Sequence, residues 1–505
     1  MESIKNHSFI IEKAPISVSA FLTETMTRNI LNNIDRSKID IVLLPGFVQW
    51  DTLSLEQEFS LAIRKGPEFA SSIPAVINNL GKLNLSNKIA ANKLIESSGE
   101  EFYNKLVRNQ YEIASEQLGN HTFFMNEKKP ELMIGRNLPP PIIAEIVNCT
   151  EKDDNSILRK ANHYLRSGAD IIDIGCVSNK PNPQRVREIV KLLRHDFDVL
   201  LSIDSMNTDE ILAAVDEGID LILSIDLGNY NNFTDIPKNL PIVILPTKIN
   251  EGYFPKEPDI RVKNLLELTR KLKNLGFQKL IADPLLETPI SPGICRSLET
   301  YMLYKKTVAL DENQDLELPM FFGISNVVEL MDIDSVGING LLASIAIELD
   351  MGILFTVEHS TKMMGGVAEL KQCTKLNYIS KFRKTPPINQ GIQIFKAKGK
   401  VSQEIPEFDD RVATVVNSFN SSYEPDPSGY FKIHINHYAG KIYIFHFSNK
   451  DELKNILIGK SAEGISKKVI ELKLTEILSH INYLGRELAK AENCLLTGAP
   501  YIQDD

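Results

Sequence analysis

Eight apolar segments recur along the middle of the chain, and their regular spacing constrains the fold more than any other feature of the sequence. Each is long enough for one strand and runs into a polar residue, and stretches with helical periodicity separate most of them. Strands that alternate with helices indicate a parallel sheet, and eight such units match a (β/α)8 TIM barrel. A doubly wound sheet would leave the eighth strand unexplained. The segments are residues 142–148, 168–175, 199–205, 221–226, 241–247, 279–284, 320–326 and 353–359.

Helical patterns fill the long gaps between these segments. In the first gap, apolar residues recur at helical spacing from Ser156 to Ser167, and Gly168 follows as a typical C-terminal cap. Asn207 is placed to cap the third helix, with Glu210 three residues later. The gap at 227–240 is too short and polar for a full helix and predicts a single turn. Further helices are expected at 184–194, 260–275, 296–309 and 337–349.

Two regions precede the barrel, which we assign to residues 141–380. Residues 1–120 predict a small α/β domain, because an apolar strand at 39–47 is followed by helical patterns, notably at 98–118. Residues 121–140 are polar and run into three consecutive prolines, which favour extended backbone and stop helices. We therefore predict a linker between the first domain and the barrel.

Residues 381–505 predict a C-terminal α+β domain. It begins with a loop-rich connection at 383–430. Strand patterns at 430–437 and 441–447 flank a turn and indicate a hairpin, and one long helix is expected at 465–491. Four histidines lie on these elements, and we expect them to be structural, with metal or flavin binding as the alternative. They are His434, His437, His446 and His480.

Composition limits the kinds of protein that this chain can be. The net charge of −10 argues against a nucleic-acid surface, which concentrates Lys and Arg. The five cysteines form no CxxC pair, so we expect neither a disulfide framework nor a zinc site, in keeping with a reducing compartment. The most apolar region, 340–355, contains Glu348 and Asp350 and is not a membrane span. These features predict a cytoplasmic protein that binds neither nucleic acid nor membranes.

The polar residues that end the strands form the predicted functional site. The active site of a TIM barrel lies at the carboxyl ends of its strands, where the connecting loops converge. Most of the residues there are acids and amides, which suit a ligand rich in N–H donors or a metal bound through oxygen. A single carboxylate of this kind is about as often a helix cap as a ligand contact. The set comprises Asn148, Asp173, Ser178, Asp204, Ser224 or Asp226, Thr247, Asp283, Ser325, Asn326, Glu358 and His359.

Several of these residues carry a family resemblance. Asn148, the run GADIIDIG with SNKP at 178–181, SIDS at 202–205 and DP at 283–284 follow in an order that resembles the pterin-binding barrel of dihydropteroate synthases. The resemblance extends to methyltransferases with the same barrel, which pass a methyl group from a methyl-tetrahydropterin to a corrinoid protein. Over nearly its whole length, the chain is also similar to archaeal proteins related to dihydropteroate synthase.

The resemblance implies roles for particular residues. Asp204 and Asp283 would accept hydrogen bonds from the pyrimidine N–H and amino groups of a pterin, as a carboxylate accepts two parallel bonds from Arg. The implied ligand is a reduced pterin of the tetrahydrofolate or tetrahydromethanopterin type, with Mg2+ as an optional ion and no metal centre built by the protein. The other implied pterin contacts are Asn148, Asp173, Asn179, Ser224 and Asn326, and the rim candidates are Lys180, Glu358, His359 and Lys362.

Departures from the synthase pattern bear on the reaction. The resemblance leads us to expect a Lys after the seventh strand and an Arg and a His after the eighth, to expel pyrophosphate, whereas this chain has Asn326 and then Glu358 and His359. The segments GISN and DPLLETP resemble the corrinoid-linked methyltransferases, in which the residue matching Asn326 contacts the pterin near N5. We therefore predict transfer of a pterin-bound methyl group, with Asn326 and Asp204 as catalytic residues.

Two alternatives to methyl transfer stay open at this point. One is true dihydropteroate synthesis, and the other is a pterin carrier or sensor without catalysis. The predicted partners are the pterin and a corrinoid or other acceptor protein, and a homodimer is also left open.

Overall fold

The structure is a computed structural model that describes residues 8–16, 18–77, 80, 83–94, 99–127, 129–392, 394, 425–499 and 501–503. The chain falls into two compact units. The first comprises Met1–Leu330, Gly337–Val357 and Val367–Ile394, and the second comprises Met331–Val336, Glu358–Gly366 and Phe395–Asp505. Within the described ranges, no helix combines the length and the apolar character needed to cross a bilayer.

Eight parallel strands form the centre of the first unit. They are β5 (Ile142–Ile146), β6 (Ile171–Gly175), β7 (Leu200–Asp204), β8 (Leu221–Asp226), β9 (Ile242–Leu245), β10 (Leu280–Ala282), β11 (Phe321–Gly323) and β12 (Ile353–Val357). Their order in the sheet is β10-β9-β8-β7-β6-β5-β12-β11, and a parallel bridge between Ala282 and Met320 joins the two outer strands. The sheet therefore closes on itself, and the predicted TIM barrel is confirmed.

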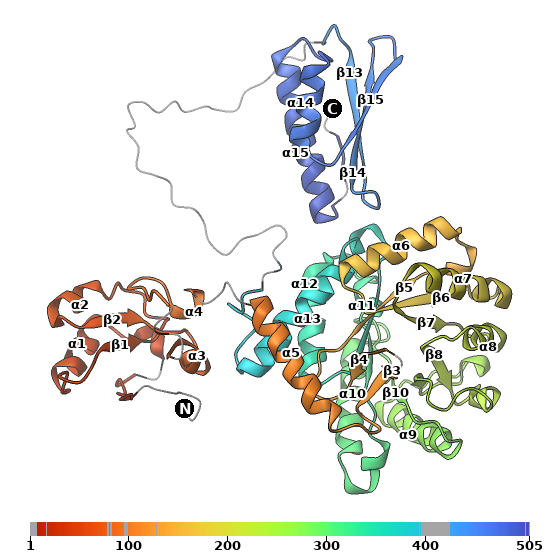
Figure 1. Cartoon of the computed structure of the whole chain (residues 1–505), viewed down its shortest axis with the longest axis horizontal. Helices are drawn as coiled ribbons and strands as arrows, with labels where there is room; N and C mark the ends of the chain where they lie inside the picture. The colour runs from red at the N-terminus through yellow and green to blue at the C-terminus, as the bar shows by residue number, and fades with distance from the viewer. Residues whose placement is uncertain are drawn as a thin grey trace. The chain divides into compact units, whose positions relative to one another are not determined.

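Helices connect or follow these strands (Figure 1). They are α6 (Asp154–Ser167), α7 (Pro183–Asp196), α8 (Thr208–Asp216), α9 (Pro258–Asn274), α10 (Ile294–Val308), α11 (Ser325–Val328), α12 (Ser335–Glu348) and α13 (Gly366–Arg383). Their ends follow the local sequence. Gly168 ends α6 with a φ of 97°, and Asn207 caps α8 by accepting a hydrogen bond from the N–H of Glu210. The single turn predicted after β8 is the 3₁₀ helix η5 (Tyr230–Phe233).

Inward-facing side chains fill the barrel with one apolar layer. Such a layer makes the interior of a TIM barrel a packed core rather than a pore. The strands contribute Ile143, Ile171, Leu200, Leu221, Leu223, Val243, Ile281, Phe321, Ile353 and Phe355.

A β-hairpin, β3 (Phe123–Asn126) and β4 (Lys129–Ile134), packs against this layer. Its side chains Phe123, Met125 and Ile134 are buried in the same core. The prediction of a linker at 121–140 is therefore wrong for this stretch. Alternate apolar residues on the hairpin bury one face, and that burial outweighs the polar average composition that suggested a linker.

Polar contacts of the hairpin show which end of the barrel it closes. Asn126 donates to Asp220 (2.6 Å), which precedes β8, and Glu127 pairs with Lys279 (3.2 Å), which precedes β10. Both partners lie at the amino ends of their strands. The carboxyl end therefore stays available for a ligand.

The region before the hairpin contains a two-stranded parallel sheet and five helices among the described residues. These are α1 (Glu24–Asn32), β1 (Ile41–Leu44), α2 (Leu53–Phe59), β2 (Ala62–Lys65), α3 (Ile73–Ile77), α4 (Ala91–Leu94) and α5 (Gly99–Ser115). Leu31, Leu55 and Ile63 belong to its own core. Helix α5 instead packs on α13, where the Tyr103 and Tyr378 ring centroids are 5.9 Å apart.

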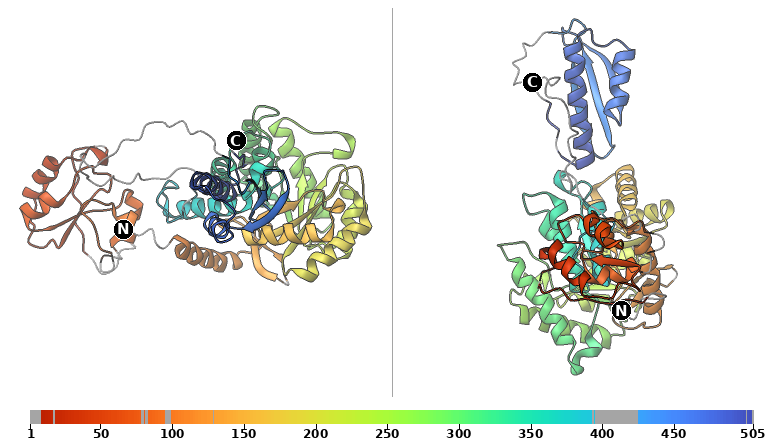
Figure 2. Two further views of the ribbon diagram at one scale, coloured as in Figure 1. Left: turned by 90° about the horizontal axis from the view of Figure 1, so that it is seen from above. Right: turned by 90° about the vertical axis from the view of Figure 1, so that its left-hand side faces the viewer.

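The second unit contains a three-stranded antiparallel sheet with two helices on one face (Figures 1 and 2). Its elements are β13 (Tyr430–Asn436), β14 (Lys441–Phe447), β15 (Leu453–Gly459), α14 (Ala462–Glu471) and α15 (Leu478–Thr497). The predicted hairpin is β13 and β14. Sheet and helices share one core, made by Phe431, Ile433, Ile442, Ile444, Ile465, Val469, Leu484 and Leu488.

Two features of this domain differ from the sequence prediction. The single helix expected at 465–491 is two helices, because Lys473 adopts a left-handed φ of 49° and the chain turns there. Strand β15 was not predicted, because its sequence, LKNILIG, places apolar residues on both faces and so lacks the alternation of a half-buried strand. Most of the connection predicted at 383–430 lies outside the described residues.

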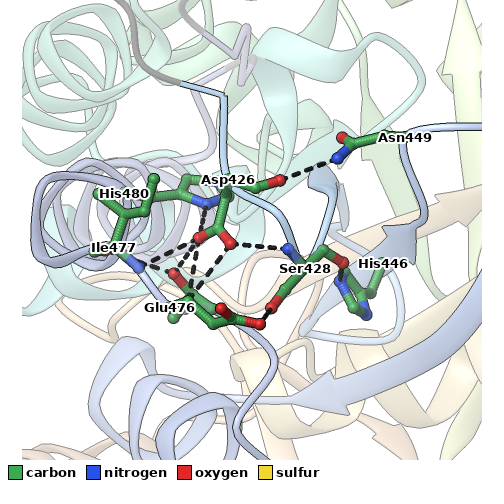
Figure 3. A network of polar contacts seen from close by, with 8 residues as sticks. Asp426, Ser428, His446, Asn449, Glu476, Ile477 and His480 are labelled. Atoms are coloured by element: carbon green, nitrogen blue, oxygen red, sulfur yellow. Dashed lines mark hydrogen bonds and ion pairs between the residues drawn. The ribbon is translucent and has the colours of Figure 1, made fainter.

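Asp426 holds several parts of the C-terminal domain together (Figure 3). Its side chain accepts hydrogen bonds from His480 Nδ1 (2.8 Å), Thr475 Oγ1 (2.5 Å) and the N–H groups of Ser428 (2.9 Å) and Glu476 (3.1 Å). Burial raises the pKa of Asp426, but these hydrogen bonds outweigh burial and hold the pKa well below its ordinary value. Asp426 therefore fixes the segment before β13 to the start of α15.

Two of the four histidines have polar side-chain contacts inside this domain. His446 Nε2 lies 2.9 Å from the Ser428 carbonyl oxygen, and His480 contacts Asp426. These contacts agree with a structural role for both.

We expect Asp426→Asn to destabilise the C-terminal domain by roughly 1.5–3 kcal/mol, the range for hydrogen bonds to a charged group. Because the native pKa is depressed, this stability is present above the unfolded-state pKa of about 3.9 and is lost as the pH falls through the native value. Hydrogen exchange of the β13 and β14 amides in the full chain at pH 7 measures the effect.

The matched control is Asp451→Asn, which alters an exposed carboxylate that accepts one hydrogen bond from Tyr430 (2.7 Å). Its effect should stay within about 0.5 kcal/mol, as for most surface substitutions. Equal protection of the wild type and Asp426→Asn would show that the network does not stabilise the domain.

Candidate functional site

Three carboxylates meet inside the barrel at the carboxyl ends of neighbouring strands. Glu145 is on β5, Asp173 on β6 and Asp204 on β7, and oxygen atoms of the three lie within 4.8 Å of one another. Glu145 lies beside Asp173 in the strand register, and Asp204 lies beside Gly175. Since alternate residues of a strand face the same side, the three acids follow the apolar layer on its inward-facing side.

Gly175 provides the space for this arrangement. A Cβ atom at this position would collide with Oε1 of Glu145. The glycine at the end of β6 therefore allows the Glu145 side chain to cross β6 and bring its carboxyl close to the other two acids.

The Asp173 carboxyl is fully buried, and only one of its oxygens is satisfied. Oδ1 accepts a hydrogen bond from Ser202 Oγ (2.5 Å), whereas Oδ2 has no hydrogen-bond partner in the described part of the chain. No described Lys, Arg or His forms an ion pair with Glu145, Asp173 or Asp204. The group is thus short of donors and of positive charge.

Burial without a counter-ion favours the protonated form of a carboxyl. Burial raises the pKa of Glu145 to about 8, and the nearby Asp204 carboxylate adds to the rise. Burial also raises the pKa of Asp204 to about 6 and, together with both neighbours, raises that of Asp173 well above its ordinary value. The group therefore retains protons near neutral pH, and a ligand with N–H donors or positive charge can replace them.

A fourth acid, Asp283, follows β10 at the same end of the barrel. Its Oδ1 accepts hydrogen bonds from the N–H of Leu285 (2.8 Å) and the hydroxyl of Tyr301 (3.3 Å). Burial raises the pKa of Asp283 to about 7, although these bonds and the positive charge of Arg261 oppose the rise. Arg261 is itself buried and pairs with Glu287 (2.8 Å).

Other polar residues at the strand ends fix the loops. Asp226 accepts hydrogen bonds from Thr247 Oγ1 (2.9 Å) and the N–H of Ile249 (2.7 Å), so it joins the loops that follow β8 and β9. Glu210, on α8, accepts a hydrogen bond from Ser205 Oγ (2.5 Å) and holds the loop after β7. The contacts of Asp226 and Thr247 account for both residues without a ligand.

Asn326 connects two loops at this rim. Its Nδ2 donates to the carbonyl oxygen of Leu286 (3.0 Å), which joins the loop after β11 to the segment after β10. The side chain is exposed, and its contact with a pterin stays a prediction.

The structure brings only some of the predicted site residues together. Asp173 and Asp204 meet, whereas Asn148 starts a 3₁₀ turn after β5 with a left-handed φ of 52°. Ser224 lies near the carboxyl end of β8, where the pairing with β9 shifts register. Asn148 and Ser224 therefore lie at the predicted end of the barrel, and their ligand contacts stay predictions.

Asn179 and Lys180 lie on the connection that follows β6. Asn179 is exposed with a φ of 67°, and the neighbouring Lys180 pairs with Glu151 (2.8 Å). Three further candidates belong to the second compact unit, in which Lys362 donates to the carbonyl oxygen of Met331. Those three are Glu358, His359 and Lys362, and their roles stay predictions.

Sequence analysis missed Glu145, although a signal for it was present. The strand IIAEI contains one acid among apolar residues, the same pattern that singled out Asp173. Period-two alternation places Glu145 on the inward face with Ile143. An acid on the inward face of a barrel strand should therefore have been included among the candidates.

Comparisons with known proteins agree with this geometry. A family model described as "Pterin binding enzyme" matches residues 146–338, and a model named PterinBD-DUF4346 matches residues 425–504. The protein MJ0107 of Methanocaldococcus jannaschii is 33% identical over 514 residues, which cover 100% of this chain and 95% of that protein. A dihydropteroate synthase of Streptococcus pyogenes is 27% identical over 116 residues, 21% of this chain and 44% of that enzyme.

Solved structures of dihydropteroate synthases are also similar. One is Yersinia pestis dihydropteroate synthase with a pterin–sulfa conjugate, at 19% identity and a TM-score of 0.40. The match covers 50% of this chain and 97% of that one.

We expect Glu145→Gln to stabilise the barrel at high pH and to leave it unchanged at low pH. The native pKa of Glu145, about 8, lies above the ordinary value of 4.5, so the native state binds more protons between these values. The free energy of unfolding therefore falls as the pH rises from about 5 to 8. Gln resembles the protonated form of Glu. The free energy of unfolding of Glu145→Gln should therefore exceed that of the wild type by roughly 2–4 kcal/mol at pH 8.

Urea unfolding followed by pulse proteolysis, with EDTA present, measures this difference. The control is Glu151→Gln, which alters an exposed carboxylate and should shift stability by less than about 1 kcal/mol at either pH. A Glu145→Gln protein that is less stable than the wild type at pH 8 would show that the charged form is the native one.

Proposed function

We propose that this chain binds a reduced pterin and transfers a group that the pterin carries. The premise is that the chain belongs to the family of pterin-binding barrel proteins that includes MJ0107 and is related to dihydropteroate synthase. The observation that carries the proposal is the buried group of Glu145, Asp173 and Asp204, which lacks a counter-ion among the described residues. The group lies at the end of the barrel that the hairpin leaves open.

A pterin supplies what this group lacks. The amino-pyrimidinone edge of a pterin presents amino and ring N–H donors side by side, and a carboxylate accepts two parallel bonds of this kind. We assign this contact to Asp204 and Asp283, with the unpartnered Oδ2 of Asp173 as a further acceptor. Each bond to a charged acceptor contributes about 1.5–3 kcal/mol.

The pairing of two barrel cations with acids favours methyl transfer over dihydropteroate synthesis as the proposed reaction. Stabilising a departing pyrophosphate needs cations aimed at it. Two cations on connections that follow barrel strands are paired with acids, Lys180 with Glu151 and Arg261 with Glu287. The loop after β11 provides Asn326 instead of a cation.

Methyl transfer makes smaller demands on the site. A nucleophilic acceptor forms a bond to the methyl carbon while the bond from that carbon to N5 breaks, and N5 keeps the electron pair and takes up a proton. Asn326 is the residue that we assign to a hydrogen bond at N5, which would favour its protonation. The acceptor, a corrinoid or another acceptor protein, would approach at the rim formed by the loops.

A divalent cation suits the same carboxylates. Mg2+ prefers oxygen ligands, and the three acids offer oxygens close enough to contact one ion. Glu145, Asp173 and Asp204 would hold it, and its positive charge would favour their ionised forms. Binding of the pterin should therefore be compared with and without Mg2+.

We expect Asp204→Asn and Asp283→Asn each to weaken binding of 5-methyltetrahydrofolate by roughly tenfold to a hundredfold, because one charged acceptor is lost. Isothermal titration calorimetry at pH 7 measures the dissociation constants. Asp235→Asn, an exposed change after η5, is the matched control and should bind like the wild type. A wild type that binds no reduced pterin, or two variants with unchanged affinity, would refute the site.

We expect little or no pteroate synthesis from dihydropterin pyrophosphate and an arylamine, because the departing pyrophosphate would meet an acidic site. Pyrophosphate release and pteroate formation are followed together. The parallel assay supplies 5-methyltetrahydrofolate and reduced cobalamin and follows loss of the methyl donor, which Asn326→Ala should slow. Pteroate turnover within the usual enzyme range of about 1–10³ s⁻¹ would assign the synthase reaction instead.

A further inference from the structure

The two edges of the C-terminal sheet differ in how they are covered. The sheet order is β13-β14-β15, so β13 and β15 are the edges. At the β13 edge, Gln503 Oε1 accepts a hydrogen bond from the N–H of Ile433 (2.9 Å), and its Nε2 donates to the carbonyl oxygen of Phe431 (2.9 Å). The side-chain amide of Gln503 thus takes the place of a neighbouring strand.

The same contact fixes which backbone groups face the other edge. In an antiparallel sheet, the N–H and C=O of one residue point to the same side, and successive residues alternate. The N–H and C=O groups of Ile433 point away from β14. The same groups of its register partner, Ile444, therefore point toward β15, where Ile444 pairs with Leu457. The flanking residues Ile456 and Ile458 must therefore direct their N–H and C=O groups outward.

This outward edge of β15 is apolar and uncovered in the part of the chain that the structure describes. The side chains of Ile456 and Ile458 are 48% and 55% exposed, and no described residue forms a backbone hydrogen bond to this edge. Lys454 is the one charged residue within the strand. Edges are normally protected by charges, proline or a covering segment, and an open apolar edge is a template for strand pairing.

We propose that β15 of one molecule pairs antiparallel with β15 of a second copy, which gives a dimer with a continuous six-stranded sheet. The occupant must be a strand, because the groups on offer are main-chain donors and acceptors in a row. A two-fold axis at Ile456 sets Lys454 opposite Ile458 of the second copy, so no like charges face each other. Ile456 and Ile458 of each copy then offer their main-chain donors and acceptors to the second copy, next to the register shift at Lys454.

Gln503, which occupies the N–H of Ile433 and the C=O of Phe431 at the β13 edge, explains why this pairing stops at two copies. A sheet with two open edges could add molecules without limit, whereas one open edge gives a closed, two-fold assembly. The side chains support the same pairing. Ile456 and Ile458 stand beside Phe445 and Tyr443 on the sheet face opposite the helices, so pairing makes one apolar surface continuous across both copies.

Sedimentation velocity of the full chain between about 1 and 100 μM tests the proposal. The wild type should be a dimer, and Ile456→Lys should weaken the dimer at least ~100-fold, because two introduced ammonium groups would face each other at the axis. Leu496→Lys on α15, where the leucine is 72% exposed, is the matched control and should stay dimeric. A monomeric wild type, or an Ile456→Lys protein that remains fully dimeric, would overturn the proposal.

Hydrogen exchange separates lost pairing from lost folding. In the dimer, the amides of Ile456 and Ile458 should be protected although they face outward, and dilution or Ile456→Lys should release them while Leu457 stays protected. Removing the cover with Gln503→Ala should open the second edge and produce species larger than a dimer. Fast exchange of Ile456 and Ile458 in a wild-type dimer would place the interface elsewhere and refute β15 pairing.

Discussion

Burial of carboxylates without counter-ions is the physical constraint on which the rest of this site depends. An ionised acid in an apolar interior costs several kcal/mol unless it is paired. Three strands nevertheless bring Glu145, Asp173 and Asp204 together, and Gly175 leaves the space for it. In the ligand-free protein, protonation of these carboxylates lowers the free-energy cost of burying them. A ligand that donates N–H groups to these oxygens therefore gains binding energy that it would not gain at a solvated acid.

The apolar layer, together with the hairpin at the amino ends of the strands, keeps the surroundings of these carboxylates apolar. Phe123, Met125 and Ile134 extend the barrel core beyond the amino ends of the strands and leave the acids no contact with water from that side. Polar contacts such as Asn126 with Asp220 fix the hairpin at its edge. The low polarity beneath the acids is thus a property of residues far from them in sequence, and it is what raises their pKa values.

Local signals explain what the sequence predicted and what it did not. The barrel strands and the caps at Gly168 and Asn207 depend on neighbouring residues, and the predictions for them are confirmed. The hairpin at 123–134 depends on burial against strands that come later in the chain, so its composition alone suggested a linker. Asp173 was predicted from its apolar surroundings, and the same criterion applied to β5 would have found Glu145.

The sequence does not show which buried acids lack hydrogen-bond donors within the protein. Asp173, Asp226 and Asp426 are all buried, but their hydrogen-bond donors differ. Asp226 receives donors from the loops after β8 and β9, and Asp426 receives them from α15 and its neighbours, which lowers the pKa of Asp426. Asp173 receives one hydroxyl and keeps an oxygen without a partner. The supply of donors, which only the folded loops determine, therefore separates the structural acids from an acid that still has an oxygen free for a ligand.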